Sequence, residues 1–140
     1  MSTDNKELAR RARLEMWTNP ALADEILAPE FVLHALDPIT PRLSAGPENM
    51  KKIMNLYVSA FPDVKFTVED VIAEGDRVVL RWSATGTHRA GLMGIAATGK
   101  QVTVTGTDIY RISGGKLREG WFHWDALGFI QQLGAVPRLE

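Results

Sequence analysis

The sequence predicts an α+β fold in which N-terminal helices pack on the concave face of a curved antiparallel sheet. Apolar residues recur at helical spacing through most of residues 6–61, whereas apolar and polar residues alternate with period two from residue 64 onward. A short helical segment follows the last alternating stretch. Helices that precede a long meander of strands are typical of an α+β domain, and a strongly curved sheet covered by helices forms a cone with an open mouth.

Length and composition limit the class of protein. The 140 residues suit one domain spanning 1–140, since no repeat, low-complexity tract or linker divides them. The net charge is −1, there is no cysteine, and no apolar run approaches the ~18 residues that suggest a membrane span. The first residues are charged and include no apolar leader. We therefore expect a cytoplasmic protein that binds neither nucleic acid nor membrane.

The first half of the chain contains three predicted helices and one strand. The first helix covers residues 6–17, and Asn19-Pro20 ends it because the residue before a proline avoids the helical region. A short helix over 21–27, a strand over 31–34 and a loop over 35–46 follow, and Pro47 opens a helix that reaches residue 61. The apolar stripe of the first helix consists of Leu8, Ala12, Leu14, Met16 and Trp17.

The second half of the chain predicts four strands and a closing helix. The strands cover residues 64–73, 77–88, 101–112 and 117–124. A turn at 74–76, a glycine-containing loop at 90–100 and a hairpin turn at 113–116 join them. Asp125 is placed to cap the helix over 126–133, and Gly134 is placed to end it.

Strand parity predicts which side chains face the concavity. His88 ends the apolar face of the second strand, and we assign the face of the third strand that carries Asp108 and Tyr110 to the interior. The last strand has aromatic rings on both faces, with Phe122 on one and Trp121 on the other. We therefore expect one face to line a cavity and the other to meet a partner subunit, which predicts a homodimer.

Three motifs occur in a characteristic order: AFPDVKFTVEDVIAEGDRVVLRWSATGTH, GLMGIAATGKQVTVTG and YRISGGKLREGWFHWDALGFIQQLG. They resemble the SnoaL-like polyketide cyclase family, and the resemblance extends from the first helix to Gly134. It implies the fold of the nuclear-transport-factor-two-like superfamily, which hosts isomerases, epoxide hydrolases, dehydratases, cyclases and non-catalytic binders. It also implies ring closure in an aromatic polyketide ester by aldol condensation, without a metal or an organic cofactor.

The resemblance assigns roles to individual positions. The cyclases use an acidic side chain near the end of the last strand as general acid/base, assisted by pocket histidines, and that position holds Phe122 in this chain. One pocket histidine of the family corresponds to Asp108, and the histidine of the GTH motif corresponds to His88. Either Asp108 has taken over the acid/base role from across the cavity, or the alignment shifts and Asp125 is the counterpart.

We predict a catalytic group of Asp108, His88 and His34. A carboxylate that is desolvated in an aromatic cavity suits the removal of a proton next to a carbonyl group. His88, with His34 near the cavity mouth, would donate to the developing enolate oxygen. Structural roles remain open for all three, since an arginine such as Arg81 could pair with Asp108 and either histidine could orient backbone.

The expected ligand is a hydrophobic small molecule with a carbonyl group. The expected reaction is polyketide cyclase-like, or a related isomerase or lyase (dehydratase) step; the alternative, favoured by Phe122, is a non-catalytic binding protein of the same fold. The spacing of the three histidines fits no metal site, so we expect neither a metal nor a cofactor. The residues predicted to line the hydrophobic pocket are Met54, Tyr57, Phe61, Trp82, Met93, Tyr110, Phe122 and Trp124.

Overall fold

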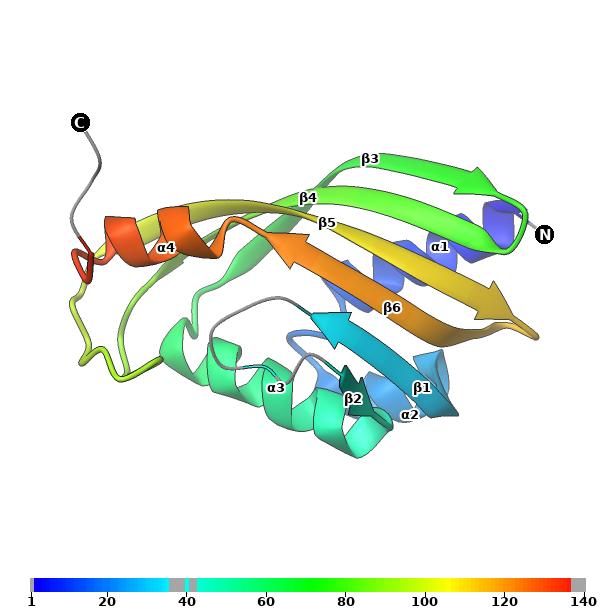
Figure 1. The fold of residues 1–140 in the computed structure, drawn as a ribbon, viewed down its shortest axis with the longest axis horizontal. Coiled ribbons are helices and arrows are strands. Elements are labelled where there is room, and N and C mark those ends of the chain that lie inside the picture. Colours follow the sequence, from blue (N-terminus) through cyan, green and yellow to red (C-terminus); the bar gives the residue numbers. More distant parts are fainter. Residues whose placement is uncertain (1, 36–39, 41–42, 137–140) are drawn as a thin grey trace.

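The structure, a computed structural model, describes residues 2–35, 40 and 43–136. In these ranges the chain forms helices and six strands, arranged as a curved sheet with helices against it (Figure 1). The elements are α1 (Ser2–Leu14), a 3₁₀ helix η1 (Pro20–Leu22), α2 (Ala23–Ile26), β1 (Leu27–Ala35), β2 (Leu43–Ala45), α3 (Pro47–Ala60), β3 (Lys65–Glu74), β4 (Arg77–Thr87), β5 (Gln101–Ser113), β6 (Lys116–Trp124) and α4 (Ala126–Gln132). No helix in these ranges is both long and apolar enough to cross a membrane.

The sheet has the strand order β2-β1-β6-β5-β4-β3. Strands β3 to β6 form the predicted antiparallel meander. The predicted curved antiparallel sheet is thereby confirmed, with one difference: β1 pairs with β6 in parallel. A parallel pair needs a long connection, and α3 and the meander supply it. β2 pairs with β1 and lies in a segment that was predicted to be loop.

The helices cover the concave face of the sheet, as predicted. In Figure 1, α1 lies behind β4 and β5, and α3 lies beneath the edge formed by β1 and β2. α1 packs mainly against β3 and β4, and α3 packs against β1 and β2. The first helix starts and ends earlier than predicted, so Met16 and Trp17 lie in the turn after it. Leu14 is 40% exposed and does not belong to the buried stripe.

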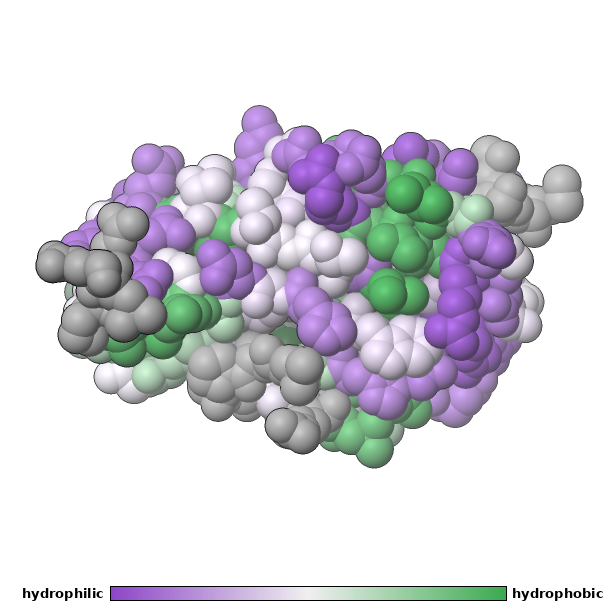
Figure 2. Space-filling view, turned by 45° about the horizontal axis from the view of Figure 1, so that its top comes forward, coloured by the Kyte–Doolittle hydropathy of each residue, from purple (hydrophilic) through white to green (hydrophobic). Residues whose placement is uncertain are grey.

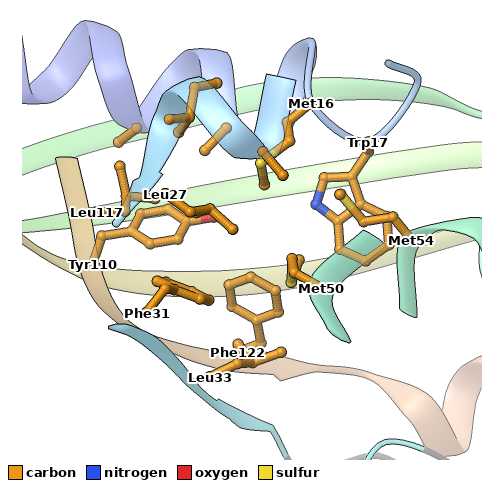
Figure 3. Packing of buried hydrophobic residues seen from close by; sticks show 14 of the residues in the cluster. Met16, Trp17, Leu27, Phe31, Leu33, Met50, Met54, Tyr110, Leu117 and Phe122 are labelled. Carbon is orange, nitrogen blue, oxygen red and sulfur yellow. The ribbon is translucent and has the colours of Figure 1, made fainter. Parts of the chain in front are cut away.

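The hydrophobic core fills much of the space between helices and sheet. Its larger part joins α1, α2, α3 and β1 to the inner face of the meander, and Figure 3 shows Trp17 and Phe122 among its rings. The ring centroids of these two residues are 6.4 Å apart. A smaller cluster closes the end of the sheet where α4, the end of α3 and the β4–β5 connection meet.

Gly106 lets an aromatic ring lie flat on the inner face of the sheet. It pairs with Trp82 across β4 and β5, and a Cβ at residue 106 would overlap the Trp82 indole ring and lie 2.9 Å from the Cβ of Trp124. A residue with a side chain would therefore displace Trp82. The Trp82 ring forms part of the wall of an internal cavity.

Candidate functional site

An apolar cavity lies inside the cone, between the inner face of the sheet, α3 and the end of α1. Its volume is about 90 Å³, several times the roughly 10–15 Å³ that one water molecule requires. Side chains therefore do not fill the cone. The predicted lining residues that face this cavity are Tyr57, Phe61, Trp82, Phe122 and Trp124.

Three residues predicted to line the cavity lie elsewhere. Met54 and Tyr110 are fully buried in the hydrophobic core, because close packing surrounds their side chains on the inner face. Met93 lies on the β4–β5 connection, in a separate shallow depression that Leu56 and Leu92 also line. The predictions for these three residues are corrected accordingly.

Asp108 is on the inner face of β5, as predicted, and is fully buried. Arg13 donates to it from Nε (2.9 Å to Oδ2) and from Nη2 (2.8 Å to Oδ1 and 2.7 Å to Oδ2). Trp82 Nε1 donates to Oδ1 and the Tyr110 hydroxyl donates to Oδ2, each at 3.0 Å. Both carboxylate oxygens therefore already accept at least two hydrogen bonds.

Tyr110 keeps its proton in this network. Burial, followed by the nearby Asp108 carboxylate, raises the pKa of Tyr110 well above its usual value of 10.0. The hydroxyl therefore remains a donor to Asp108 at every pH near neutrality. Asp108 is absent from the cavity wall, so its predicted role as the proton-abstracting base stays a prediction that this saturated geometry does not favour.

Arg13, like Trp82, both donates to Asp108 and lines the cavity. Its side chain is only 2% exposed, yet it lines the cavity. The central guanidinium carbon lies 4.2 Å from the ring centroid of Trp82 and 4.7 Å from that of Trp17. The rings of Phe122 and Phe66 lie 5.1 and 5.3 Å away. Guanidinium groups stack favourably on aromatic faces, so the rings and Asp108 hold Arg13 in place.

Arg13 was not among the predicted site residues, although the sequence contained a signal for it. Ala9, Ala12 and Met16 are buried, and Arg13 occupies the position four residues after Ala9 on the same face of α1. A charged residue on the buried face of an amphipathic helix needs a buried partner. That requirement, together with the inward aspartate on β5, would have predicted the pair.

His88 is fully buried, but it does not line the cavity. It stacks on Phe61, with ring centroids 5.3 Å apart, and its Nδ1 accepts from the backbone N–H of Thr98 at 3.2 Å. Leu80 lies opposite Asp108, and His88 is eight residues further along the chain. At about 3.3 Å per residue, roughly 26 Å separates these positions, so His88 and Asp108 do not act on one atom.

His34 lies on the outer face of the sheet. Its neighbours Leu33 and Ala35 line the cavity, and alternation along β1 therefore turns His34 away from it. His34 stacks on Trp121 with centroids 5.2 Å apart and donates from Nε2 to Glu119 at 2.6 Å. The prediction that His34 lies near the cavity mouth is wrong.

Glu119 connects His34 to Arg111 on the outer face of the sheet, and these three residues form the outer group. The hydrogen bond from His34, joined by one from Arg111, lowers the pKa of Glu119 below its usual value of 4.5. Arg81, which was considered as a partner of Asp108, pairs instead with Asp70 on the outer face, with Nε 2.7 Å from Oδ2. Asp125 accepts from the N–H of Gly128 at 2.9 Å, which confirms its predicted role as the cap of α4.

The cavity wall thus offers a cation and aromatic rings. Among the described residues, no carboxylate and no imidazole lines it. Among the residues that the structure describes, no group of three or more acidic or histidine side chains is arranged to hold a metal ion. The wall can bind an apolar molecule and donate hydrogen bonds to it.

Comparison with known proteins gives one family. A family model described as SnoaL-like polyketide cyclase matches residues 7–133. Comparison with curated proteins finds no significant match.

Solved structures with the same fold carry different descriptions. TsrD from Streptomyces laurentii is 28% identical, with a TM-score of 0.84 over 97% of this chain and 98% of its own. A provisionally named polyketide cyclase from Acidithiobacillus ferrooxidans is 32% identical, with a TM-score of 0.81 over 97% of this chain and 99% of its own. AclR from Streptomyces galilaeus, provisionally named a hydroxylase, is 27% identical, with a TM-score of 0.83 over 100% and 91%. The shared fold therefore does not determine the reaction.

Proposed function

This chain belongs to the SnoaL-like polyketide cyclase family, and we propose that it closes a ring in a hydrophobic, carbonyl-containing small molecule. The observation that carries this proposal is the apolar cavity with aromatic rings on its wall. Such a wall suits a flat molecule that is largely apolar. The family supports an aldol-type ring closure, and isomerisation or dehydration would begin with the same transfer of a proton next to a carbonyl group.

The cavity contributes mainly by holding the substrate in a folded shape. Ring closure needs a nucleophilic carbon close to a carbonyl carbon of the same molecule, and fixing such a geometry can supply a large part of the rate acceleration. Trp17, Trp124 and Tyr57 line the cavity from different elements and can restrict a flexible chain from several sides. Hydrogens between two carbonyl groups of the substrate are acidic, so water can take the proton without a strong protein base, and a proton returns to the oxygen that becomes an alkoxide on ring closure.

The experiment that tests this function compares substitutions at two neighbouring positions of β4, one alanine and one serine. Ala84 lines the cavity and Ser83 points to the opposite face of β4. With an aromatic β-diketo ester as substrate, we expect the wild type to form cyclised product faster than buffer alone, as measured by liquid chromatography. Ala84→Leu should abolish this excess by filling the cavity, and Ser83→Leu should retain it. No excess product with the wild type would contradict the proposed reaction.

A non-catalytic binding protein is the second candidate. It is favoured by the absence of carboxylates and imidazoles from the described part of the cavity wall, and by Phe122 at the position where the family carries its acid. In that case the same ester binds saturably to the wild type and no cyclised product appears. Calorimetric titration beside the product assay separates the two candidates.

We also propose that the outer face of the sheet pairs with a second copy of this chain. Six residues that lie opposite one another in register cross all the strands: Leu43, His34, Trp121, Ile109, Val79 and Ile72. Leu43 is 62% exposed and Ile72 is 64% exposed. In Figure 2, apolar side chains lie among hydrophilic ones on the face turned towards the viewer.

The charges beside this row favour a copy of the same chain over another partner. Arg77 and Arg111 lie beside Glu119 on one surface, so two copies related by a twofold axis can place opposite charges together. Analytical ultracentrifugation at micromolar concentration should give twice the mass of 15.5 kDa. Ile109→Glu should give the monomer mass, whereas a monomeric wild type would contradict the dimer.

A further inference from the structure

The guanidinium group of Arg13 has one edge with which no described residue pairs. Nε and Nη2 donate to Asp108, whereas Nη1 donates to no described residue. The side chain is 2% exposed, and it lines the cavity. Among the described residues, Nη1 is not one of the side-chain atoms that are fully closed off and lack a partner, so accessible space adjoins it. The edge that carries Nη1 therefore faces the cavity, where a ligand or water can accept from it.

The charge around Arg13 is already balanced. The Asp108 carboxylate neutralises the guanidinium group, and the rings of Trp82 and Trp17 cover its faces. A ligand carboxylate at Nη1 would leave one excess negative charge against an apolar wall, which is unfavourable. A carbonyl oxygen accepts the same hydrogen bonds without adding a charge.

We propose that Arg13 binds an uncharged carbonyl oxygen of the ligand through Nη1 and thereby selects ketones and esters over carboxylates. Asp108 acts on the ligand only through Arg13: with Trp82 and Tyr110 it fixes the position of the guanidinium group. The proposal rests on the cavity being the ligand site of the proposed function, and it names the residue that decides which apolar molecules bind there.

Three ligands with the same naphthalene ring system test this selection. They are 2-acetylnaphthalene, 2-ethylnaphthalene and 2-naphthoate, which differ in whether they present a carbonyl, no acceptor or a negative charge. By calorimetric titration at pH 7, we expect the wild type to bind the ketone about tenfold more tightly than the hydrocarbon. We expect 2-naphthoate to bind more weakly than the ketone.

Arg13→Lys is the matched variant. Lysine keeps a positive charge opposite Asp108, but its ammonium group is a point charge without a second edge for the ligand. We expect the variant to lose the preference for the ketone over the hydrocarbon, which is measured as the ratio of the two affinities. Should lysine prevent folding, as judged by circular dichroism, the double variant Arg13→Met with Asp108→Asn removes both charges and serves the same purpose.

The outcomes separate this inference from the proposed function. Equal binding of ketone and hydrocarbon by the wild type overturns the role of Arg13 while leaving the cavity as a ligand site. A wild type that prefers 2-naphthoate, or a folded variant that keeps the full ketone preference, also overturns it. Binding of none of the three ligands overturns the cavity as a ligand site, and the inference fails with it.

Discussion

The two faces of the sheet each hold an acidic residue bonded to an arginine, but in opposite surroundings. On the inner face, Asp108 is 0% exposed and Arg13 is 2% exposed. On the outer face, the side chains of Glu119 and Arg111 are 24% and 36% exposed, and their closest nitrogen–oxygen distance is 3.2 Å rather than 2.7 Å. The two faces of the sheet therefore hold the same kind of ion pair in two different dielectric environments.

The difference shows what each arrangement can do. A buried ion pair cannot lose one partner without leaving an uncompensated charge, so Arg13 and Asp108 have only one acceptable arrangement. An exposed pair exchanges its partners for water at little cost, so Glu119 can serve an interface or respond to pH. The inner pair is suited to fixing a donor against the cavity, and the outer group is suited to a surface that assembles.

The largest expected effect comes from removing one charge of the inner pair. Asp108→Asn should lower the free energy of unfolding by about 3–5 kcal/mol, because Arg13 would stay buried without a counter-charge. Glu119→Gln should lower it by less than about 1 kcal/mol, because water replaces the lost partner. Urea denaturation of both variants measures the two values. Equal losses would mean that burial does not distinguish the two faces.

A smaller effect is expected from the residue that lets Trp82 reach Asp108. Gly106→Ala should cost about 1–3 kcal/mol of unfolding free energy, since the new methyl group would push the indole ring away from the carboxylate. Gly91→Ala is the matched control, because its Cβ would lie 3.6 Å from the Ile95 carbonyl oxygen, an ordinary contact. Near-ultraviolet circular dichroism should change for the first variant alone. An unchanged spectrum and stability for Gly106→Ala would show that Trp82 is not held there.

The smallest effect is expected from acid titration of the outer group. The folded-state pKa of Glu119 lies below 4.5, so its contribution to stability is present above that pH and is lost as pH falls through the folded pKa. Between pH 5 and pH 3, Glu119→Gln should therefore lose stability less steeply than the wild type, by less than about 1 kcal/mol. Thermal melts across this range compare them, and parallel curves would contradict the assignment.

Local patterns in the sequence were enough to predict the meander and its inner face. The period-two alternation placed Val78, Leu80 and Trp82 inward, and these residues are buried. The parallel pairing of β1 with β6 was not predictable in this way, since it joins strands that are far apart in the chain and leaves no local signature. β2 was not predictable either, because its three residues are too few to show a period.

The site was predicted less completely than the fold. Parity gives the face on which a side chain lies, and it correctly turned Asp108 inward, but it does not give the depth of burial. Tyr110 shares the face of Phe122 yet lies in the core, with the two ring centroids 5.9 Å apart, whereas Phe122 reaches the cavity. Arg13 was missed because its partner Asp108 lies 95 residues away: the buried face of α1 signals that a partner is needed, but it does not say which one.

That separation also bears on how the protein is made. During synthesis α1 emerges before β5, and its arginine stays hydrated until the strand with its counter-ion has been synthesised. β1 likewise waits for β6, which is synthesised only after β2 to β5. Contacts of such long range form late and slowly. The sheet is therefore completed only after β6 has been synthesised, and a nascent chain that ends before β5 would expose Trp17 and Trp82 to other proteins.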